Sequence, residues 1–96
     1  MDNDRKISWV LKPQEETKTY RCPCCNYKTL FGRGGYEICP VCFWEDDGQD
    51  QPDADIALGG PNAALSLSEA RANFQRLGAI EERLQAYVRL PMADEI

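Results

Sequence analysis

The chain has 96 residues, the size of one small domain, with 11 Lys and Arg against 16 Asp and Glu, a net charge of -5 and no His. The lack of His excludes a Ser–His–Asp triad and a His-ligated metal. The acidic balance argues against sequence-independent binding of DNA or RNA. No apolar run reaches the roughly 18 residues of a membrane span, so we expect no membrane partner.

Five cysteines are many for a chain of this length. No apolar leader segment follows the charged first residues, so we expect a cytoplasmic protein, in which thiols stay reduced. An odd number of cysteines also fits a closed set of disulfides poorly. Because so small a domain often needs a covalent or metal cross-link, the cysteine count predicts a metal site.

We expect a single α+β domain over residues 1–96. Residues 1–19 form its N-terminal arm, in which Ile7, Trp9 and Leu11 alternate with other residues and predict a short strand that ends at Pro13. Trp9 either packs on the core, which we favour, or is offered to a partner by a flexible arm.

Residues 20–44 contain two Cys-x-x-Cys motifs with a Gly-rich run, Gly32–Gly35, between them. Short apolar and aromatic runs flank the glycines, Lys28–Phe31 before them and Tyr36–Ile38 after them. Glycine adopts the positive φ angles that a tight turn needs. The pattern therefore predicts a β-hairpin of the zinc-ribbon or rubredoxin-knuckle kind.

Residues 45–65 are predicted to form an acidic loop, and two helices follow over residues 66–90. Ser66 and Glu69 form a capping box at the start of the first helix, and Gly78 suits the left-handed position at its end. The second helix is expected over Ala79–Leu90, ended by Pro91, with the last five residues frayed. The helical residues expected in the core are Leu67, Ala70, Phe74, Leu77, Ile80, Leu84, Tyr87 and Val88.

The cysteines at 22, 25, 39 and 42 have the spacing C-x2-C-x13-C-x2-C. A Cys-x-x-Cys turn brings two sulfurs close enough to share a metal, and two such turns complete a tetrahedron. We therefore predict one structural zinc ion held by Cys22, Cys25, Cys39 and Cys42. Asn26 follows the first pair, where such turns usually have Gly, and Asn tolerates positive φ well.

Two alternatives to this site stay open. The four cysteines would otherwise form two separate dithiol pairs, or would hold iron as in rubredoxin, whose knuckles are much further apart in sequence. Cys24 is a small apolar filler, which we favour, an alternative ligand, or a reactive thiol beside the metal.

The motifs resemble those of the bacterial cysteine-rich CPCC family. The resemblance rests on Cys22-Pro23-Cys24-Cys25, on the run from Tyr36 to Gly48 and on the shorter downstream matches Gly60-Pro61-Asn62, Ser66-Leu67, Glu69-Ala70-Arg71, Asn73-Phe74 and Gly78-Ala79. It covers roughly Tyr20 to Ile80 and departs from the pattern at Asn26. It implies a small zinc-binding module without an established activity, with the N-terminal arm and the last helix outside the family pattern.

Charge is segregated along the chain: residues 1–36 sum to +3, and residues 37–55 sum to -7. A one-sided acidic cluster steers a basic partner, so we expect a docking surface here rather than a calcium loop or a pair of catalytic carboxylates; a plain solvated loop is the alternative. Arg71 is read as a surface charge and Asn62 as a turn or cap residue. The residues predicted to bind the partner are Phe43, Trp44, Glu45, Asp46, Asp47 and Asp50; for Phe43 and Trp44 the alternative, which we favour, is core packing around the metal.

Together these features predict a non-catalytic, zinc-stabilised protein-interaction module. Its most concrete form is an acidic inhibitor or immunity-type protein that binds a basic effector such as a toxin. A rubredoxin-like electron carrier and a thiol or zinc redox sensor are the alternatives, and we do not expect an enzyme.

Overall fold

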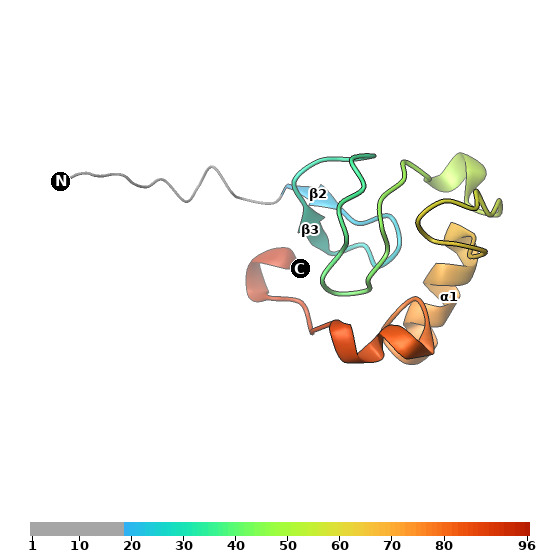
Figure 1. Cartoon of the computed structure of the whole chain (residues 1–96). Helices are drawn as coiled ribbons and strands as arrows, with labels where there is room; N and C mark the ends of the chain where they lie inside the picture. Colours follow the sequence, from blue (N-terminus) through green and yellow to red (C-terminus); the bar gives the residue numbers. More distant parts are fainter. Residues whose placement is uncertain (1–18) are drawn as a thin grey trace.

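The computed structural model describes residues 19–96 (Figure 1). Strand β2 (Tyr20–Arg21) pairs antiparallel with strand β3 (Lys28–Leu30), with Tyr20 opposite Leu30. The connection between them is the first Cys-x-x-Cys turn, so this small ribbon carries the first knuckle at its end. The strand predicted around Trp9 lies outside the described residues.

The predicted hairpin is wrong in its pairing. Lys28–Phe31 was expected to pair with Tyr36–Ile38, but β3 pairs with β2, and Ile38 forms a bridge with Glu45. The main chain of 36–37 hydrogen-bonds to that of Asp46, at 2.9 Å in both directions. The physical reason is that each knuckle closes its own hairpin, which leaves the Gly-rich run as a connection between the two.

The acidic loop contains a short 3-10 helix, η2 (Gln51–Asp53), that the sequence pattern did not predict. Its N-cap is Asp50, whose carboxylate accepts a hydrogen bond from the amide of Gln51 at 2.8 Å. The Asp53 carboxylate in turn accepts from the amide of Asp50 at 3.0 Å. Carboxylates of the acidic stretch therefore satisfy backbone amides within it.

Helix α1 (Leu67–Leu77) begins and ends as predicted. The hydroxyl of Ser66 accepts from the amide of Glu69 at 3.0 Å, and the Glu69 carboxylate accepts from the amide of Ser66 at 2.9 Å. Gly78 has a φ of 78°, and its amide donates to the carbonyl of Phe74 at 2.8 Å. The capping box and the left-handed glycine are both confirmed.

The second helix is shorter than predicted, because the chain forms only the 3-10 helix η3 (Glu82–Tyr87). Leu84 is buried, but Tyr87 is 69% exposed, so its predicted place in the core is wrong. Val88 is extended, and the next residue, Arg89, donates its amide to the carbonyl of Pro40 at 3.1 Å. The helix ends before Pro91 because the chain returns to the second knuckle at Arg89.

The expectation of frayed last residues is also wrong. The 3-10 helix η4 (Ala93–Glu95) lies against β3, as the red end of the chain in Figure 1 shows. The Glu95 carboxylate is buried and binds the Arg89 guanidinium through two contacts of 2.8 and 2.9 Å. A buried carboxylate needs such a partner, and this one holds the C-terminal segment in place.

The core is centred on the cysteines. Trp44, Leu30 and Val41 pack there with residues of the helical half, namely Leu67, Ala70, Ala79, Ile80 and Leu84. The α+β class is therefore confirmed, with a small ribbon and a helical half around one cysteine-rich core. Between Thr19 and Ile96, the structure has no helix of the length and hydropathy needed to cross a membrane.

Candidate metal centre

The side chains of Cys22, Cys25, Cys39 and Cys42 converge, and all four sulfurs lie within 4.8 Å of one another. Two of the sulfur–sulfur distances, Cys22 to Cys42 and Cys25 to Cys39, are 3.6 Å. Sulfurs bound tetrahedrally at about 2.3 Å from a zinc ion stand about 3.8 Å apart. All four residues are buried, so the donor set and its geometry fit one tetrahedral cation.

The two Cys-x-x-Cys turns have matching backbones. The amide of Asn26 donates to the carbonyl of Cys22, and the amide of Phe43 donates to the carbonyl of Cys39, both at 2.8 Å. Asn26 and Phe43 also share a left-handed conformation, with φ of 70° and 76°. The prediction for Asn26 is confirmed; Phe43 was not predicted to be left-handed, because an aromatic residue rarely adopts this conformation.

Hydrogen-bond donors surround the sulfurs of the second turn. The amides of Val41 and Trp44 donate to the sulfurs of Cys39 and Cys42, each at 3.4 Å. The hydroxyl of Thr29 lies 3.0 Å from the Cys39 sulfur. Donors to a sulfur spread the negative charge of a thiolate. Thr29 was missed from the sequence, since only the pairing of β2 with β3 brings it here.

The crowding of the thiols changes their acidity in opposite directions. Hydrogen bonds with the thiols of Cys22 and Cys39, together with burial, raise the pKa of Cys25. Hydrogen bonds with the Cys22 thiol and then with the other cysteines, together with burial, raise the pKa of Cys42. Hydrogen bonds from Cys22, from the other two thiols and from Thr29 lower the pKa of Cys39. Neighbouring thiols thus share protons until a cation replaces them, because a metal binds the deprotonated form.

Cys24 lies in the same core but outside the set of four. It is 8% exposed, and none of the five cysteines forms a disulfide. A buried thiol of this kind behaves as a small apolar side chain. Its burial fits the filler role favoured from the sequence.

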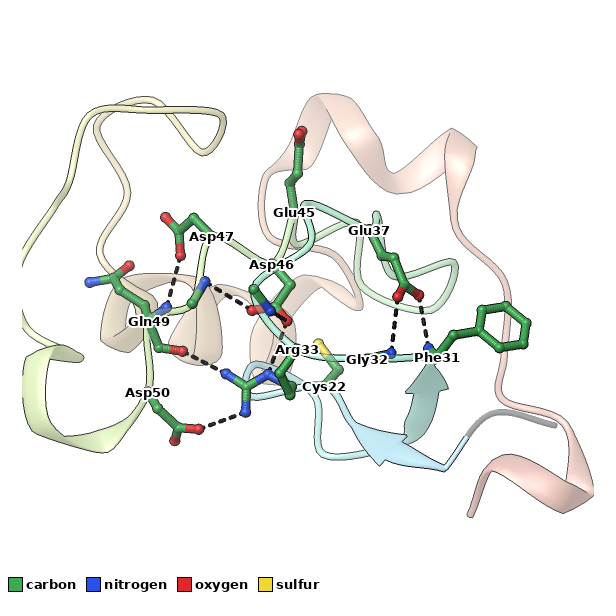
Figure 2. Close-up of polar contacts among 12 residues, drawn as sticks. Cys22, Phe31, Gly32, Arg33, Glu37, Glu45, Asp46, Asp47, Gln49 and Asp50 are labelled. Atoms are coloured by element: carbon green, nitrogen blue, oxygen red, sulfur yellow. Dashed lines mark hydrogen bonds and ion pairs between the residues drawn. The ribbon is translucent and has the colours of Figure 1, made fainter. Parts of the chain in front are cut away.

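Asp46, predicted to bind a partner, is instead fully buried. Its carboxylate accepts hydrogen bonds from Arg33 Nε at 2.9 Å, from the amide of Gly34 at 2.7 Å and from the amide of Gly48 at 3.2 Å (Figure 2). Trp44 is likewise fully buried, in the core beside the cysteines. Neither side chain offers surface to a partner in this fold, because each is needed inside it.

Most other carboxylates of residues 37–55 also accept internal hydrogen bonds. Glu37 binds the amides of Phe31 and Gly32 at 2.9 and 3.0 Å, and Asp50 binds Arg33 at 2.8 Å (Figure 2). The remaining acceptors are Asp47, toward the Gln49 amide, Asp53, toward the Asp50 amide, and Asp55, toward the Ser68 hydroxyl. The acidic stretch is therefore a structural network as well as a charged surface.

Arg33 is the cation of this network, and the sequence analysis did not single it out. Its guanidinium contacts Asp46 and Asp50 and donates to the carbonyl of Gln49 at 3.0 Å. The hydrogen bond to Arg33 lowers the pKa of Asp50, and the two carboxylates raise the pKa of Arg33 against the effect of its own burial. The sequence feature that could have indicated this role is a single Arg in a Gly-rich turn that precedes an acidic stretch.

Two further residues connect distant segments, and for one of them, Arg71, the role differs from the prediction. Arg71 is not a plain surface charge, because its Nε donates to the carbonyl of Pro23 at 2.9 Å and its NH1 group to Gln51 at 2.9 Å. Asn62 lies in a turn, as predicted, and its buried side chain also pairs with the main chain of Glu45. Both contacts join segments that are distant in sequence.

The fold and the site define a small cysteine-rich protein with a four-thiol candidate metal centre. The family described as cysteine-rich CPCC matches residues 20–95, so the chain belongs to that family. The match extends past Ile80 and includes η3 and η4, which the resemblance had left outside. No curated protein matches the chain.

Proposed function

We propose that this protein is a zinc-stabilised interaction module, in which one structural zinc ion is held by Cys22, Cys25, Cys39 and Cys42 and no reaction is catalysed. The observation that carries the proposal is the convergence of four buried sulfurs within 4.8 Å. Four protein ligands fill a tetrahedral zinc site and leave no position for a substrate. Five free thiols favour a reducing compartment such as the cytoplasm.

Zinc is preferred over iron, although four thiolates suit both metals. The segment between the two knuckles is short, and the C-terminal half hydrogen-bonds to both of them. A metal that joins the two knuckles to the C-terminal half acts as a cross-link and stabilises a small fold. An electron carrier does not need an additional helical half around its metal. An iron-loaded, coloured protein would instead favour the rubredoxin-like electron carrier.

The proposed partner is a protein with a basic surface, and the most concrete form is an inhibitor or immunity-type protein that blocks a basic effector. Seven carboxylates and no cation lie between residues 37 and 55. The carboxylate of Glu45 has no hydrogen-bond or ion-pair partner among residues 19–96, and the side chain points away from the Arg33 network (Figure 2). Charge that is not neutralised internally attracts an oppositely charged partner.

An apolar anchor for such an interface lies beside Glu45. The rings of Phe43 and Tyr87 are 6.1 Å apart at an interplanar angle of 50°, and Phe43 and Glu45 line the same small hollow. Tyr87 is largely exposed. Aromatic residues of this kind are common at the centre of protein interfaces, so Tyr87 takes the place that the sequence analysis gave to Trp44.

The test is capture of partners from the native cell with immobilised wild type, the double variant Glu45→Lys/Asp47→Lys and the control Glu82→Lys. Glu82 is exposed on η3 and does not line the hollow that contains Phe43 and Glu45. We expect a basic protein to be retained by wild type and by Glu82→Lys, released by salt, and lost with the double variant. Equal retention by the double variant in low salt, with its metal content and melting unchanged, contradicts the acidic docking surface.

A further inference from the structure

Two arginine side chains hold the backbone of the first knuckle. Arg71, on α1, donates from Nε to the carbonyl of Pro23 at 2.9 Å, and Arg21, on β2, donates from its NH1 group to the carbonyl of Asn26 at 2.7 Å. These carbonyls belong to the residues directly after Cys22 and Cys25. The orientation of both cysteines therefore depends on contacts made by cationic side chains.

The second knuckle is held at the equivalent position without a cationic side chain. Pro40 follows Cys39 as Pro23 follows Cys22, and its carbonyl accepts from the backbone amide of Arg89 at 3.1 Å. The two halves of the site thus share one geometry. They differ in that a guanidinium replaces a neutral amide at the first knuckle.

The two knuckles also differ in how the charge of their sulfurs is offset. Cys39 and Cys42 each accept from a backbone amide, whereas no amide of residues 19–96 donates to the sulfur of Cys22 or Cys25. A divalent cation with four thiolates leaves a net charge of about -2. Half of the centre therefore lacks the amide donors that spread this charge over the other half.

Positive charge gathers beside the half that lacks amide donors. Arg21, Arg33 and Arg71 line one hollow of about 280 Å³ together with Cys22 and a single carboxylate, Asp50. The hollow therefore has more positive than negative side chains, although the whole chain has a net charge of -5. Arg33 is paired with Asp46 and Asp50, so the positive field at the first knuckle comes mainly from Arg21 and Arg71, and such a field lowers the energy of thiolates there.

We propose that Arg71 is a positioning residue for the metal centre: it fixes the first knuckle through Pro23 and, with Arg21, offsets the charge of its thiolates. The proposal rests on the proposed metal site. Arg71 also donates to Gln51 at 2.9 Å, at the start of η2. One side chain thus joins the first knuckle, helix α1 and the acidic stretch, so metal loading is coupled to the order of that stretch.

The experiment compares Arg71→Met with Arg76→Met, a control on the same helix. Arg76 is exposed, and among residues 19–96 its side chain hydrogen-bonds only to the side chain of Asn73. Zinc affinity is measured by competition with a chelator, and the absorption of the cobalt-loaded proteins reports the geometry of the sulfurs. We expect Arg71→Met to weaken zinc binding about 10- to 100-fold and to shift the cobalt bands, since residues behind metal ligands act on this scale.

A second variant separates the two roles of Arg71. Arg71→Lys keeps the charge but loses the planar fork, so it recovers part of the affinity and remains measurable if Arg71→Met does not fold. A zinc affinity and cobalt spectrum of either Arg71 variant equal to those of Arg76→Met overturn the inference. If wild type binds neither zinc nor cobalt, the proposed metal function fails instead.

Discussion

The side chain of Asn62 pairs with the main chain of Glu45 in both directions. The amide of Glu45 donates to Asn62 Oδ1 at 3.0 Å, and Asn62 Nδ2 donates to the carbonyl of Glu45 at 2.7 Å. Glu45 also forms the bridge with Ile38 that closes the second knuckle. Asn62 therefore acts as one further strand residue and joins the end of the acidic loop to the hairpin that carries Cys39 and Cys42.

Replacing Asn62 tests this pairing. Asn62→Ala leaves two backbone groups of Glu45 without partners in a largely buried place, which costs about 1 to 3 kcal/mol of stability. Asn62→Asp still accepts from the amide but places a charge against the Glu45 carbonyl, so we expect it to lose at least as much. Thermal unfolding at neutral pH measures both; an Asn62→Asp variant as stable as wild type would contradict the two-way pairing.

The buried ion pair between Asp46 and Arg33 predicts a larger effect. Asp46→Ala leaves the Arg33 guanidinium without its innermost partner and two glycine amides unsatisfied. We expect the free energy of unfolding to fall by about 2 to 4 kcal/mol. This is somewhat less than for a fully buried ion pair, because Arg33 is partly exposed. The control Glu82→Ala should stay within about 0.5 kcal/mol. Equal melting of the two variants would show that the network carries no stability.

Two leucines of the C-terminal segment provide a matched comparison. Leu84 is 5% exposed and packs in the core, whereas Leu90 is 86% exposed. Leu84→Ala should cost about 2 to 4 kcal/mol through lost burial and a cavity, and Leu90→Ala about 0.5 kcal/mol or less. Urea unfolding distinguishes the two. Similar losses would mean that η3 packs through a different face.

The local features of this fold were predictable from the sequence. The capping pair of Ser66 and Glu69 and the left-handed Gly78 depend on residues within one or two helical turns. The placement of each pair of sulfurs follows from a four-residue Cys-x-x-Cys turn of known geometry. In each case the residues that decide the structure are close to one another in the chain.

The predictions that were wrong concern features that depend on contacts between distant segments. Tyr87 is exposed because Arg89 must reach Pro40, nearly fifty residues earlier, and no local pattern encodes that contact. Asp46 is buried because the Gly-rich turn folds back and presents Arg33 to it. A carboxylate in an acidic run looks the same in sequence whether it faces solvent or an arginine, so charge patterning alone did not predict the burial of Asp46.

Cysteine substitutions test the ligand assignment. Cys39→Ser removes the sulfur that accepts from the Val41 amide and lies 3.0 Å from the Thr29 hydroxyl, so we expect loss of the metal and of most of the folded structure. Cys24→Ser should retain the metal, because Cys24 lies outside the set of four. Metal content and far-ultraviolet circular dichroism of the two purified variants check this. Equal metal loss in both would place Cys24 among the ligands.

The most direct test of the central claim is the metal content of the wild-type protein, purified without added metal and measured by elemental analysis together with native mass spectrometry. The account predicts one zinc ion per chain, with the neutral mass rising by one zinc and falling by two hydrogens relative to the fully reduced metal-free chain, because a divalent cation replaces two protons. A protein that folds without any metal, or that carries iron in place of zinc, would contradict it.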